Sequence, residues 1–573
     1  MIKEQLENLI KNALKEATQE KHWAIPKDFD IPITISPHKN FGDYSSTLPL
    51  ILSKIAKDSP MNIAQLLLTK ITKDKYQFVE KIEIASPGYL NFFLQKNAFP
   101  QEILVLKNIV SSLKTFHPRP IIVEYSSPNI AKPMHIGHLR STIIGETLAK
   151  LYETLGYHVI RWNYLGDWGT QFGKLIVAYK LWGKQQEIQK NPIDNLLKLY
   201  QKFHQELKQK PELEKLAQEE FKKLEAGDKT NKRLWLWFKK ESLKEFLKIY
   251  NLLGIKFDIL KGESDFEPDL LPLIEELKKK KLIQESQGAL ILPLDEFNLP
   301  PALIQKTDKA SLYFTRDLAN LIYRIKKYHP EKILYVVGNE QSLYFKQLFS
   351  AAQILNLDPL TQLEHIKFGL ILDAHNKKFS TREGELITLK EVIDTGLKNS
   401  LAIIRDKHPQ WPLKKQKQLA QIIALGALKF NDLKSFRTQN IIFDWQQMLS
   451  FKGNSSVYLQ YTYARINKII SRAKIIQKPK IELLNKELEK NIIQNLLEFK
   501  DIVQKSAHDY APHLLANYLL SLADLLNNYY EEVPVLKELN INRRAAQIVF
   551  LKTAATILKQ GMEILGITPL KEI

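Results

Sequence analysis

Cysteine is absent from the 573 residues of this sequence. That absence excludes disulfide bridges and every zinc or iron–sulfur centre that depends on thiolate ligands. Long hydrophobic runs are missing too, and none approaches the roughly 20 apolar residues that a helix needs to cross a bilayer. The N-terminus has no apolar signal-peptide core, and its acids Glu4, Glu7 and Glu16 argue against a transit peptide. We therefore expect a cytoplasmic protein with no membrane partner.

Acidic residues are scarce relative to basic ones. The chain has 63 Asp and Glu against 83 Lys and Arg, which leaves a formal net charge of +20. A polyanion such as tRNA, rRNA or DNA, or an anionic membrane, would explain this excess as a partner, although a lysine-rich proteome would produce it as well. The chain is too long for one hydrophobic core, so three or four domains are expected. No repeat of fixed period is visible, which argues against a solenoid.

The first region, residues 1–112, has the pattern of a small α+β domain. An amphipathic helix opens it, and we expect a strand at 31–37, a turn at 40–46 and a helix at 47–57. The sequence HPRP at 117–120 then interrupts the pattern and marks a boundary.

Residues 118–394 alternate between short apolar strands and a helix at 140–156. This order predicts a Rossmann-like, doubly wound parallel sheet. The strands that we expect in it are 121–127, 158–166, 332–338 and 365–372. A stretch rich in Lys and Glu at helical spacing, about 183–305, separates the two halves, and we interpret it as a helical insertion in this domain.

The remainder of the chain is predicted to be helical, with a connector over 395–452 and an all-α bundle over 453–573. Ser455 or Ser456 could cap the first helix of the bundle, and Tyr463 lies on its apolar stripe. The fold class that follows is a multidomain α/β protein.

The stretch PMHIGH, which follows the first strand of the sheet, holds the first candidate site. Ligands of doubly wound sheets bind beyond the carboxyl ends of the strands, where the next helix directs its amides and positive dipole end at phosphate. Gly137 permits close approach because it lacks a Cβ, and His135 and His138, three residues apart, share one helix face. Two imidazole donors could then stabilise the charge of a phosphoryl-transfer transition state. Metal ligation and histidines without a function are the alternatives.

A second stretch, KKFSTREG at 377–384, follows the last expected strand. A lysine on such a glycine-containing loop can neutralise a leaving pyrophosphate, and Lys378 is the candidate. A solvated basic loop is the alternative. No Walker A or G-x-G-x-x-G pattern is present, which argues against P-loop enzymes and dinucleotide binders.

Together, HIGH at 135–138 and KFSTR at 378–382 resemble the two signatures of class I aminoacyl-tRNA synthetases. More closely, GDWGTQFG (166–173), YFTRD (313–317) and GNSSVYLQYTYARI (453–466) resemble blocks of arginyl-tRNA synthetases, in the expected order. The resemblance implies that arginine and ATP form arginyl-adenylate, that the arginyl group moves to the 3′ end of tRNA-Arg, and that tRNA is needed for the first step. It also implies a monomer, and Mg²⁺ that arrives with ATP rather than at a protein metal site.

The resemblance assigns roles to particular residues. Catalytic roles fall to His135, His138, Lys378 and Lys132. Contacts to ATP fall to His135, Gly137, His138, Lys378 and Ser380. Contacts to arginine fall to Glu124, Ser127, Asn129, Tyr313, Asp317 and Gln341. A guanidinium is a fixed fork of donors, and two carboxylates with a hydroxyl suit it.

One position departs from the class pattern, because Thr381 stands where the second lysine of the loop is usual. Lys132 is the expected compensating charge, with a plain solvent or tRNA contact as the alternative. For Glu124 the alternative is a surface acid on an edge strand, and for Asp317 an acid at a helix start paired with Arg316.

The flanking regions acquire roles from the same resemblance. Residues 1–112 would contact the tRNA elbow, and 453–573 would bind the anticodon through Tyr458, Tyr461 and Arg465, which offer stacking faces and positive charge. Two other functions stay open from the residues alone: a small-substrate adenylyltransferase, and a non-enzymatic RNA-binding relative.

Overall fold

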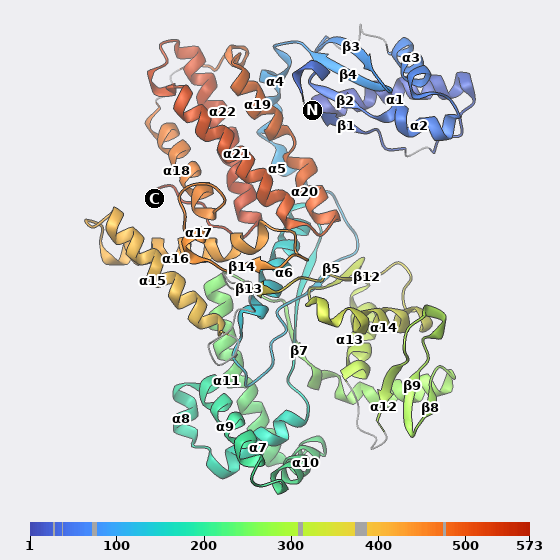
Figure 1. Ribbon diagram of the computed structural model, residues 1–573, viewed down its shortest axis with the longest axis vertical. Helices are drawn as coiled ribbons and strands as arrows, with labels where there is room; N and C mark the ends of the chain where they lie inside the picture. Colours follow the sequence, from blue (N-terminus) through green and yellow to red (C-terminus); the bar gives the residue numbers. More distant parts are fainter. Residues whose placement is uncertain (27–28, 37, 72–76, 307–312, 373–386, 474–476) are drawn as a thin grey trace.

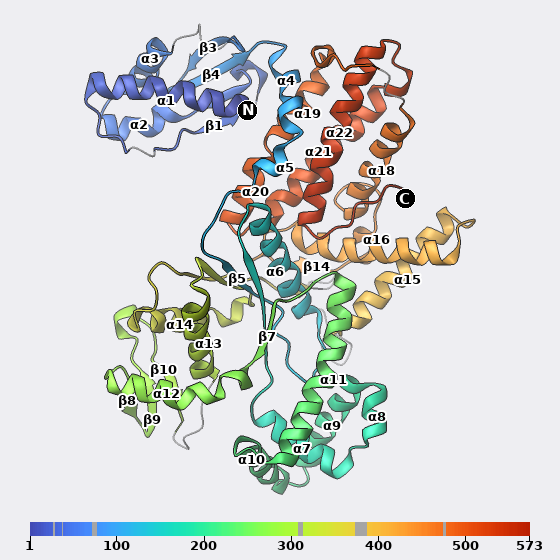
Figure 2. The same cartoon turned by 180° about the vertical axis from the view of Figure 1, so that it is seen from behind.

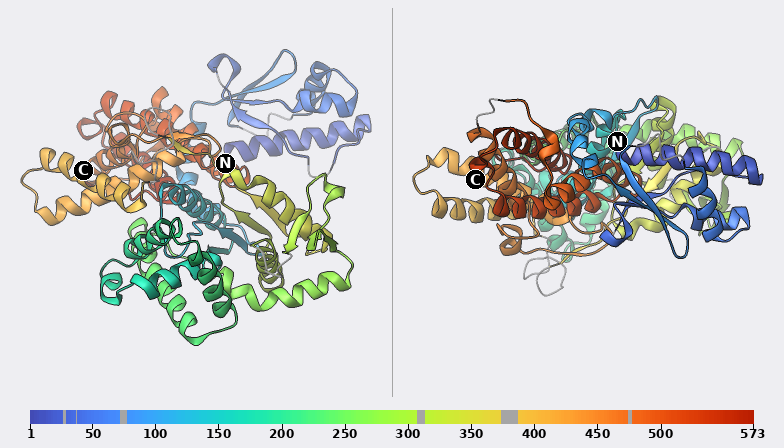
Figure 3. Two further views of the ribbon diagram at one scale, coloured as in Figure 1. Left: turned by 60° about the horizontal axis from the view of Figure 1, so that its bottom comes forward. Right: turned by 90° about the horizontal axis from the view of Figure 1, so that it is seen from above.

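The computed structural model describes all residues except 27–28, 37, 72–76, 307–312, 373–386 and 474–476. Figure 1 shows an N-terminal α+β domain beside a C-terminal helical bundle, with the central sheet and two further lobes below them. Seen from above, helices α15 and α16 and the N-terminal domain lie at opposite ends of the molecule (Figure 3). No described helix is both long and apolar enough to cross a membrane. The predicted multidomain α/β architecture is confirmed.

The N-terminal domain is a four-stranded antiparallel sheet in the order β1-β2-β4-β3, packed against helices. Its elements are α1 (Ile2–Lys21), β1 (Ile33–Ile35), β2 (Tyr44–Ser46), α2 (Leu48–Ala56), α3 (Pro60–Lys70), β3 (Val79–Ala85) and β4 (Tyr89–Leu94). Residues 44–46, predicted as part of a turn, are strand β2, because they pair with β1 on one side and β4 on the other. Helices α4 (Ala98–Leu106) and α5 (Ile109–Ser112) lead to the central domain.

The central sheet has five parallel strands in the order β12-β11-β5-β6-β7. Its strands are β5 (Ile121–Glu124), β6 (Val159–Leu165), β7 (Ile259–Gly262), β11 (Lys332–Tyr335) and β12 (Gln362–His365), and α6 (Ile136–Thr154) connects β5 to β6. The chain builds β6 and β7 on one side of β5 and then returns to build β11 and β12 on the other side. The point at which the order reverses therefore lies between β5 and β11.

Two details of the predicted sheet were wrong. The observed strand β12 covers Gln362–His365, so it ends at the first residue of the predicted strand 365–372. The last two residues of the predicted strand form the short β13 (Ile371–Leu372), which pairs with β14 (Ile441–Ile442) outside the main sheet. The predicted insertion at 183–305 contains β7, a strand of the main sheet. Both β7 and β12 are short edge strands, and Leu260 of β7 is 41% exposed, so neither shows a buried apolar run.

Because β7 belongs to the sheet, the predicted single insertion is two separate lobes, which Figures 1 and 2 show on opposite sides of the sheet. The first consists of α7 (Thr170–Trp182), α8 (Gln185–Lys190), α9 (Pro192–Leu207), α10 (Glu212–Glu225) and α11 (Lys229–Leu253). The second contains α12 (Glu267–Lys279), β8 (Gln284–Ser286), β9 (Ala289–Leu292) and β10 (Ala302–Gln305). Helix α13 (Tyr313–Tyr328) then leads to β11, and α14 (Ser342–Ile354) connects β11 to β12 of the main sheet.

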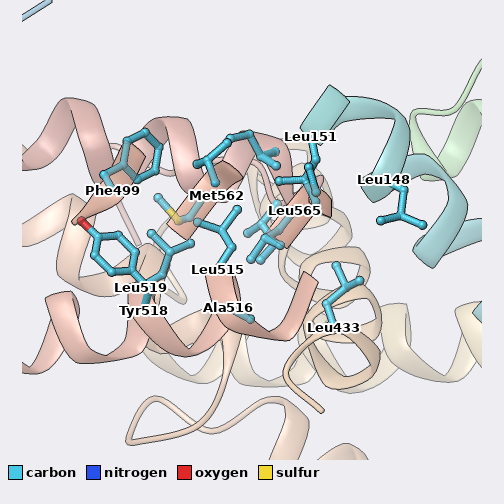
Figure 4. Close-up of a cluster of buried hydrophobic side chains, with 14 of the residues drawn as sticks. Leu148, Leu151, Leu433, Phe499, Leu515, Ala516, Tyr518, Leu519, Met562 and Leu565 are labelled. Atoms are coloured by element: carbon cyan, nitrogen blue, oxygen red, sulfur yellow. The ribbon is translucent and has the colours of Figure 1, made fainter. Parts of the chain in front are cut away.

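The C-terminal part is helical apart from β14, as predicted. Its helices are α15 (Leu389–Lys407), α16 (Leu413–Leu433), α17 (Trp445–Met448), α18 (Ser456–Arg472), α19 (Glu487–Leu497), α20 (Phe499–His508), α21 (Pro512–Glu532) and α22 (Ile541–Ile564). Ser455 caps α18 by accepting a hydrogen bond from the Tyr458 backbone N–H at 3.1 Å. Leu148 and Leu151 of α6 belong to the same buried cluster as Leu515 and Met562 of the bundle (Figure 4). The first helix of the sheet domain thus packs directly on the bundle.

Candidate active site

A cavity of about 630 Å³ opens at the carboxyl ends of β5 and β11, where the strand order reverses. Nine of the residues predicted from the sequence line it: Glu124, Ser127, Asn129, His135, Gly137, His138, Tyr313, Asp317 and Gln341. These residues come from β5, the turn after it, the start of α6, the start of α13 and a short 3₁₀ segment before α14. The tertiary structure therefore gathers segments that are more than 200 residues apart around one concave site.

The two histidines belong to the start of α6, which begins at Ile136 rather than at the predicted residue 140. His135 is the N-cap, and its Nδ1 accepts a hydrogen bond from the Gly137 backbone N–H at 3.1 Å. His138 Nδ1 accepts from the backbone N–H of His135, also at 3.1 Å, and the ring centres are 3.9 Å apart. Because His138 Nδ1 is an acceptor, the neutral His138 ring carries its proton on Nε2, where it can donate.

Burial is the main reason that the pKa of His138 falls to about 3, and the nearby His135 adds to the effect. His138 is therefore a neutral hydrogen-bond donor at physiological pH, not a positive charge. Positive potential at this end of the cavity comes instead from the N-terminal end of the α6 dipole.

The turn after β5 is held in an unusual backbone conformation. Ser126 and Ser127 have φ values of 73° and 43°, in the left-handed region that non-glycine residues rarely adopt. Ser141 of α6 accepts a hydrogen bond from the Ser126 backbone N–H at 2.9 Å and donates to the Val336 carbonyl at 2.7 Å. Sequence reasoning did not identify Ser141, yet this side chain links the ends of β5 and β11 at the reversal point.

Glu124 is buried at the end of the central strand β5, which excludes the alternative of a surface acid on an edge strand. Its carboxylate forms an ion pair with Arg324, which is fully buried and lies 4.2 Å from the ring centre of Trp162. A buried charge needs such a partner. Glu124 thus lines the cavity with its charge already balanced by the protein.

Asp317 has a different environment, in which Tyr344 of α14 donates its hydroxyl to the carboxyl group. Burial raises the pKa of Asp317 to about 7; the bond from Tyr344 opposes this rise and the nearby Glu124 adds to it. Arg316 forms its ion pair with Glu267 at 2.8 Å, so pairing with Arg316 does not explain Asp317. A cation entering the cavity would stabilise the ionised form of Asp317.

A third acid, Glu263, lines the same cavity and was missed by sequence reasoning. It follows β7 directly and is 8% exposed. Burial raises its pKa to about 8, and the neighbouring Asp317 contributes. Recognition of β7 as a strand of the sheet would have placed Glu263 at the carboxyl edge, because all five strands are parallel.

Lys132, Lys378 and Ser380 are the remaining residues predicted for this site. Lys132 is exposed, with its ammonium 5.5 Å from the ring centre of Tyr200, and is not among the described residues that line the cavity. Lys378 and Ser380, together with Thr381, fall outside the described residues. Among the described residues, no group of three or more His, Asp or Glu side chains is arranged to hold a metal ion.

Comparisons with known protein families cover nearly the whole chain. Residues 4–94 match the arginyl-tRNA synthetase N-terminal domain, and residues 100–445 match the class I tRNA synthetase (R) catalytic domain. The chain belongs to the arginyl-tRNA synthetases. Residues 459–573 match the DALR anticodon-binding domain. As a member of this family, the chain is an aminoacyl-tRNA synthetase, a ligase.

Individual relatives match over nine-tenths or more of their length. An arginine–tRNA ligase from Clostridium botulinum strain Alaska E43 is 39% identical over 566 residues, covering 98% of each chain. One from Enterococcus faecalis is 41% identical over 521 residues, covering 90% of this chain and 91% of that one. The crystal structure of arginyl-tRNA synthetase from Plasmodium falciparum superposes with a TM-score of 0.81 at 26% identity, over 100% of this chain and 99% of that one. The Thermus thermophilus arginyl-tRNA synthetase, 23% identical, has the same fold with a TM-score of 0.81 over the full length of both chains.

The residues predicted to contact tRNA in this synthetase lie on α18 and face α21. The guanidinium of Arg465 lies between two rings, 4.7 Å from the centre of Tyr461 and 4.4 Å from that of Tyr530. The Tyr458 hydroxyl donates to Asp524 at 2.7 Å. Tyr463 is 7% exposed and belongs to the core, as its place on the apolar stripe predicted.

Proposed function

We propose that this synthetase joins L-arginine to tRNA-Arg in two steps. A carboxylate oxygen of arginine attacks the α-phosphorus of ATP, pyrophosphate leaves, and arginyl-adenylate forms. A hydroxyl of the 3′-terminal ribose of the tRNA then attacks the arginyl carbonyl carbon, and AMP leaves. The tRNA is bound during the first step, and Mg²⁺ enters with the ATP phosphates.

The observation that carries this proposal is the pairing of two unlike ends in one cavity. One end presents the imidazoles of His135 and His138 and the N-terminus of α6, which suit phosphate. The other end presents the acids Glu124, Asp317 and Glu263. Within the part of the chain that the structure describes, Glu124 forms an ion pair with Arg324, and neither Asp317 nor Glu263 forms an ion pair. A substrate with an anionic reacting end and a cationic tail fits between them.

At the phosphate end, His135 and His138 donate through Nε2 to oxygens whose charge increases as pyrophosphate departs. The adenosine lies against Gly137, where the missing Cβ gives room. Lys378, Ser380 and Lys132 are assigned to the triphosphate on the resemblance to the family signatures.

At the arginine end, Asp317 and Glu263 balance the guanidinium, and Tyr313 contributes its hydroxyl. Tyr344 keeps the Asp317 carboxyl oriented through its hydrogen bond. Ser127, Asn129 and Gln341, at the other side of the lining, bind the α-amino and carboxylate groups and turn the carboxylate toward the α-phosphorus.

We also propose the division of labour along the chain. Residues 1–112 contact the tRNA elbow, 118–394 carry out both chemical steps, 395–452 connect the domains, and 453–573 bind the anticodon through Tyr458, Tyr461 and Arg465. The synthetase acts as a monomer in the cytoplasm.

Pyrophosphate exchange measured separately with each of the 20 amino acids, with and without total tRNA, tests the proposal. We expect exchange with arginine that depends on tRNA, and charging of tRNA with labelled arginine. The Asp317→Asn variant should lose arginine-dependent exchange. Asp295 is an exposed acid of the second lobe, and the Asp295→Asn variant should behave like the unaltered chain. Arginine-dependent exchange that tRNA does not affect would favour a small-substrate adenylyltransferase instead.

A further inference from the structure

Arg140 is a fully buried arginine on α6, two residues after His138. Its guanidinium donates from Nε to Asp432 Oδ2 of α16 at 3.0 Å. It also donates to three backbone carbonyls, those of Gln439 at 3.0 Å, Arg437 at 3.1 Å and Leu370 at 3.4 Å. No reaction step described above uses this side chain.

One group of these contacts belongs to the wall of the cavity. Residues 368–371 line it together with Arg140, and the guanidinium carbon of Arg140 lies 5.7 Å from the ring centre of Phe368. Arg140 therefore fixes the distance between this wall and the helix that begins with His135.

The second group belongs to a segment that we call the strap, residues 436–443, which follows α16. The strap is hydrogen-bonded to the wall along its length. The Gly369 backbone N–H donates to the Arg437 carbonyl at 3.0 Å, and the Leu370 N–H donates to Asn440 Oδ1 at 2.8 Å. The Ile441 N–H donates back to the Leu370 carbonyl at 3.0 Å. A Cβ on Gly369 would lie 2.7 Å from strap carbonyl oxygens, so the two segments pack without space between them.

The strap also contacts the C-terminal bundle at the junction of α20 and α21. Arg437 donates to the Tyr510 carbonyl at 3.1 Å, and the ring of Phe436 lies 5.2 Å from that of His513. A displacement of this junction would therefore reach the strap, and through it the cavity wall, without passing through the sheet.

We propose that Arg140 is a positioning residue through which the C-terminal bundle sets the wall of the active site at 368–371 relative to His138. This inference rests on the proposed function. The bundle binds the anticodon end of the tRNA, and the strap and Arg140 transmit its position to the cavity. The tRNA requirement of the first step then depends on an intact guanidinium fork.

The test uses the full-length chain and two RNAs, whole tRNA-Arg and an acceptor-stem minihelix without the anticodon arm. Arginine-dependent pyrophosphate exchange is measured at saturating RNA, and the ratio of kcat with whole tRNA to kcat with minihelix is the readout. Arg140→Lys keeps the charge but not the planar fork. We expect this ratio to fall about tenfold or more, with the KM for arginine within about twofold, because a misplacement of about 1 Å can cost about a hundredfold in rate.

Arg119→Lys is the matched control. Arg119 also pairs with a carboxylate, Asp358, and donates to two carbonyls, those of His329 and Pro330, but at the amino ends of the strands. The Arg119→Lys substitution should lower the melting temperature without changing the ratio of kcat with whole tRNA to kcat with minihelix. Arg437→Gln is the second variant, for the case that Arg140→Lys does not fold. It removes the bond from the strap to Tyr510 and the guanidinium that lies 5.2 Å from the Phe436 ring, and it changes no residue that lines the cavity.

An unchanged ratio in Arg140→Lys and Arg437→Gln, or equal losses with both RNAs, overturns the inference while the unaltered chain remains an active arginine enzyme. If the unaltered chain gives no arginine-dependent exchange with either RNA, the proposed function fails first and this inference with it.

Discussion

Arginine should bind more tightly as the pH rises from 6 to 8, because Asp317 carries a proton in the free cavity at low pH. Its pKa is about 7. About a tenth of the molecules have an ionised Asp317 at pH 6 and about nine-tenths at pH 8, so the ionisation of Asp317 by itself should increase arginine affinity about tenfold over this range. The sign follows from linkage: the guanidinium favours the carboxylate, so binding releases a proton, and release costs less at higher pH.

Two variants separate Asp317 from the rest of the cavity. The Tyr344 hydroxyl donates to Asp317, and this bond lowers the Asp317 pKa. Tyr344→Phe removes the bond, so the midpoint of the pH profile should move upward. Asp317→Asn should bind arginine weakly. Any pH dependence that this variant keeps belongs to Glu263, whose pKa of about 8 would extend the rise to higher pH.

Isothermal titration of arginine at pH 6, 7 and 8 gives the affinities, and repetition in two buffers of different ionisation enthalpy counts the protons released. At pH 6 close to one proton should leave Asp317 per arginine bound, and up to one more should leave Glu263, which is also protonated at that pH. A Kd that does not change between pH 6 and 8 would refute the assignment of a protonated Asp317 to the guanidinium site. A midpoint that moves downward in Tyr344→Phe would do the same.

Three further outcomes are expected. His138→Ala should slow adenylate formation by a factor of about a hundred to a thousand, the usual loss for one donor to a developing charge, and leave the Kd for tRNA unchanged in filter binding; comparable losses in both would contradict the phosphate role. Gly166→Ala places a Cβ 2.0 Å from Asn129 Oδ1 and should raise the KM for arginine at least about tenfold, so a normal KM would remove Asn129 from the site. Leu519→Ala, in the buried cluster of Figure 4, should reduce the free energy of unfolding by about 2–5 kcal/mol in urea titrations, and a loss below about 1 kcal/mol would mean that the bundle core collapses around the gap.

Local sequence was sufficient to predict the part of the site that is built from neighbouring residues. His135, Gly137 and His138 form one helix start, so their spacing alone predicted two donors at a phosphate-binding turn. Even there the helix begins four residues earlier than predicted, because the His135 ring caps the Gly137 N–H and the His138 ring caps the His135 N–H, and both bonds depend on ring orientation. Periodicity does not report that orientation.

The edge strands were not predictable from pattern. Strands β7 and β12 have four residues each and each pairs with a neighbour on one side only, β7 with β6 and β12 with β11. Their stability comes from the neighbouring strand rather than from their own apolar content, so Glu263, which follows β7, could not be assigned to the cavity.

What the sequence determined by itself was the order of the domains, the central strands and the turn that carries the two histidines, because buried strands and helix starts are encoded by adjacent residues. The tertiary structure alone decided the charges of the site. Glu124 is balanced by Arg324, 200 residues away, Asp317 meets Tyr344 from another helix, and Arg140 meets the wall and the strap about 230 and 300 residues further along the chain. Electrostatic partners are selected by distance in space, and a linear sequence does not specify that distance until the chain has folded.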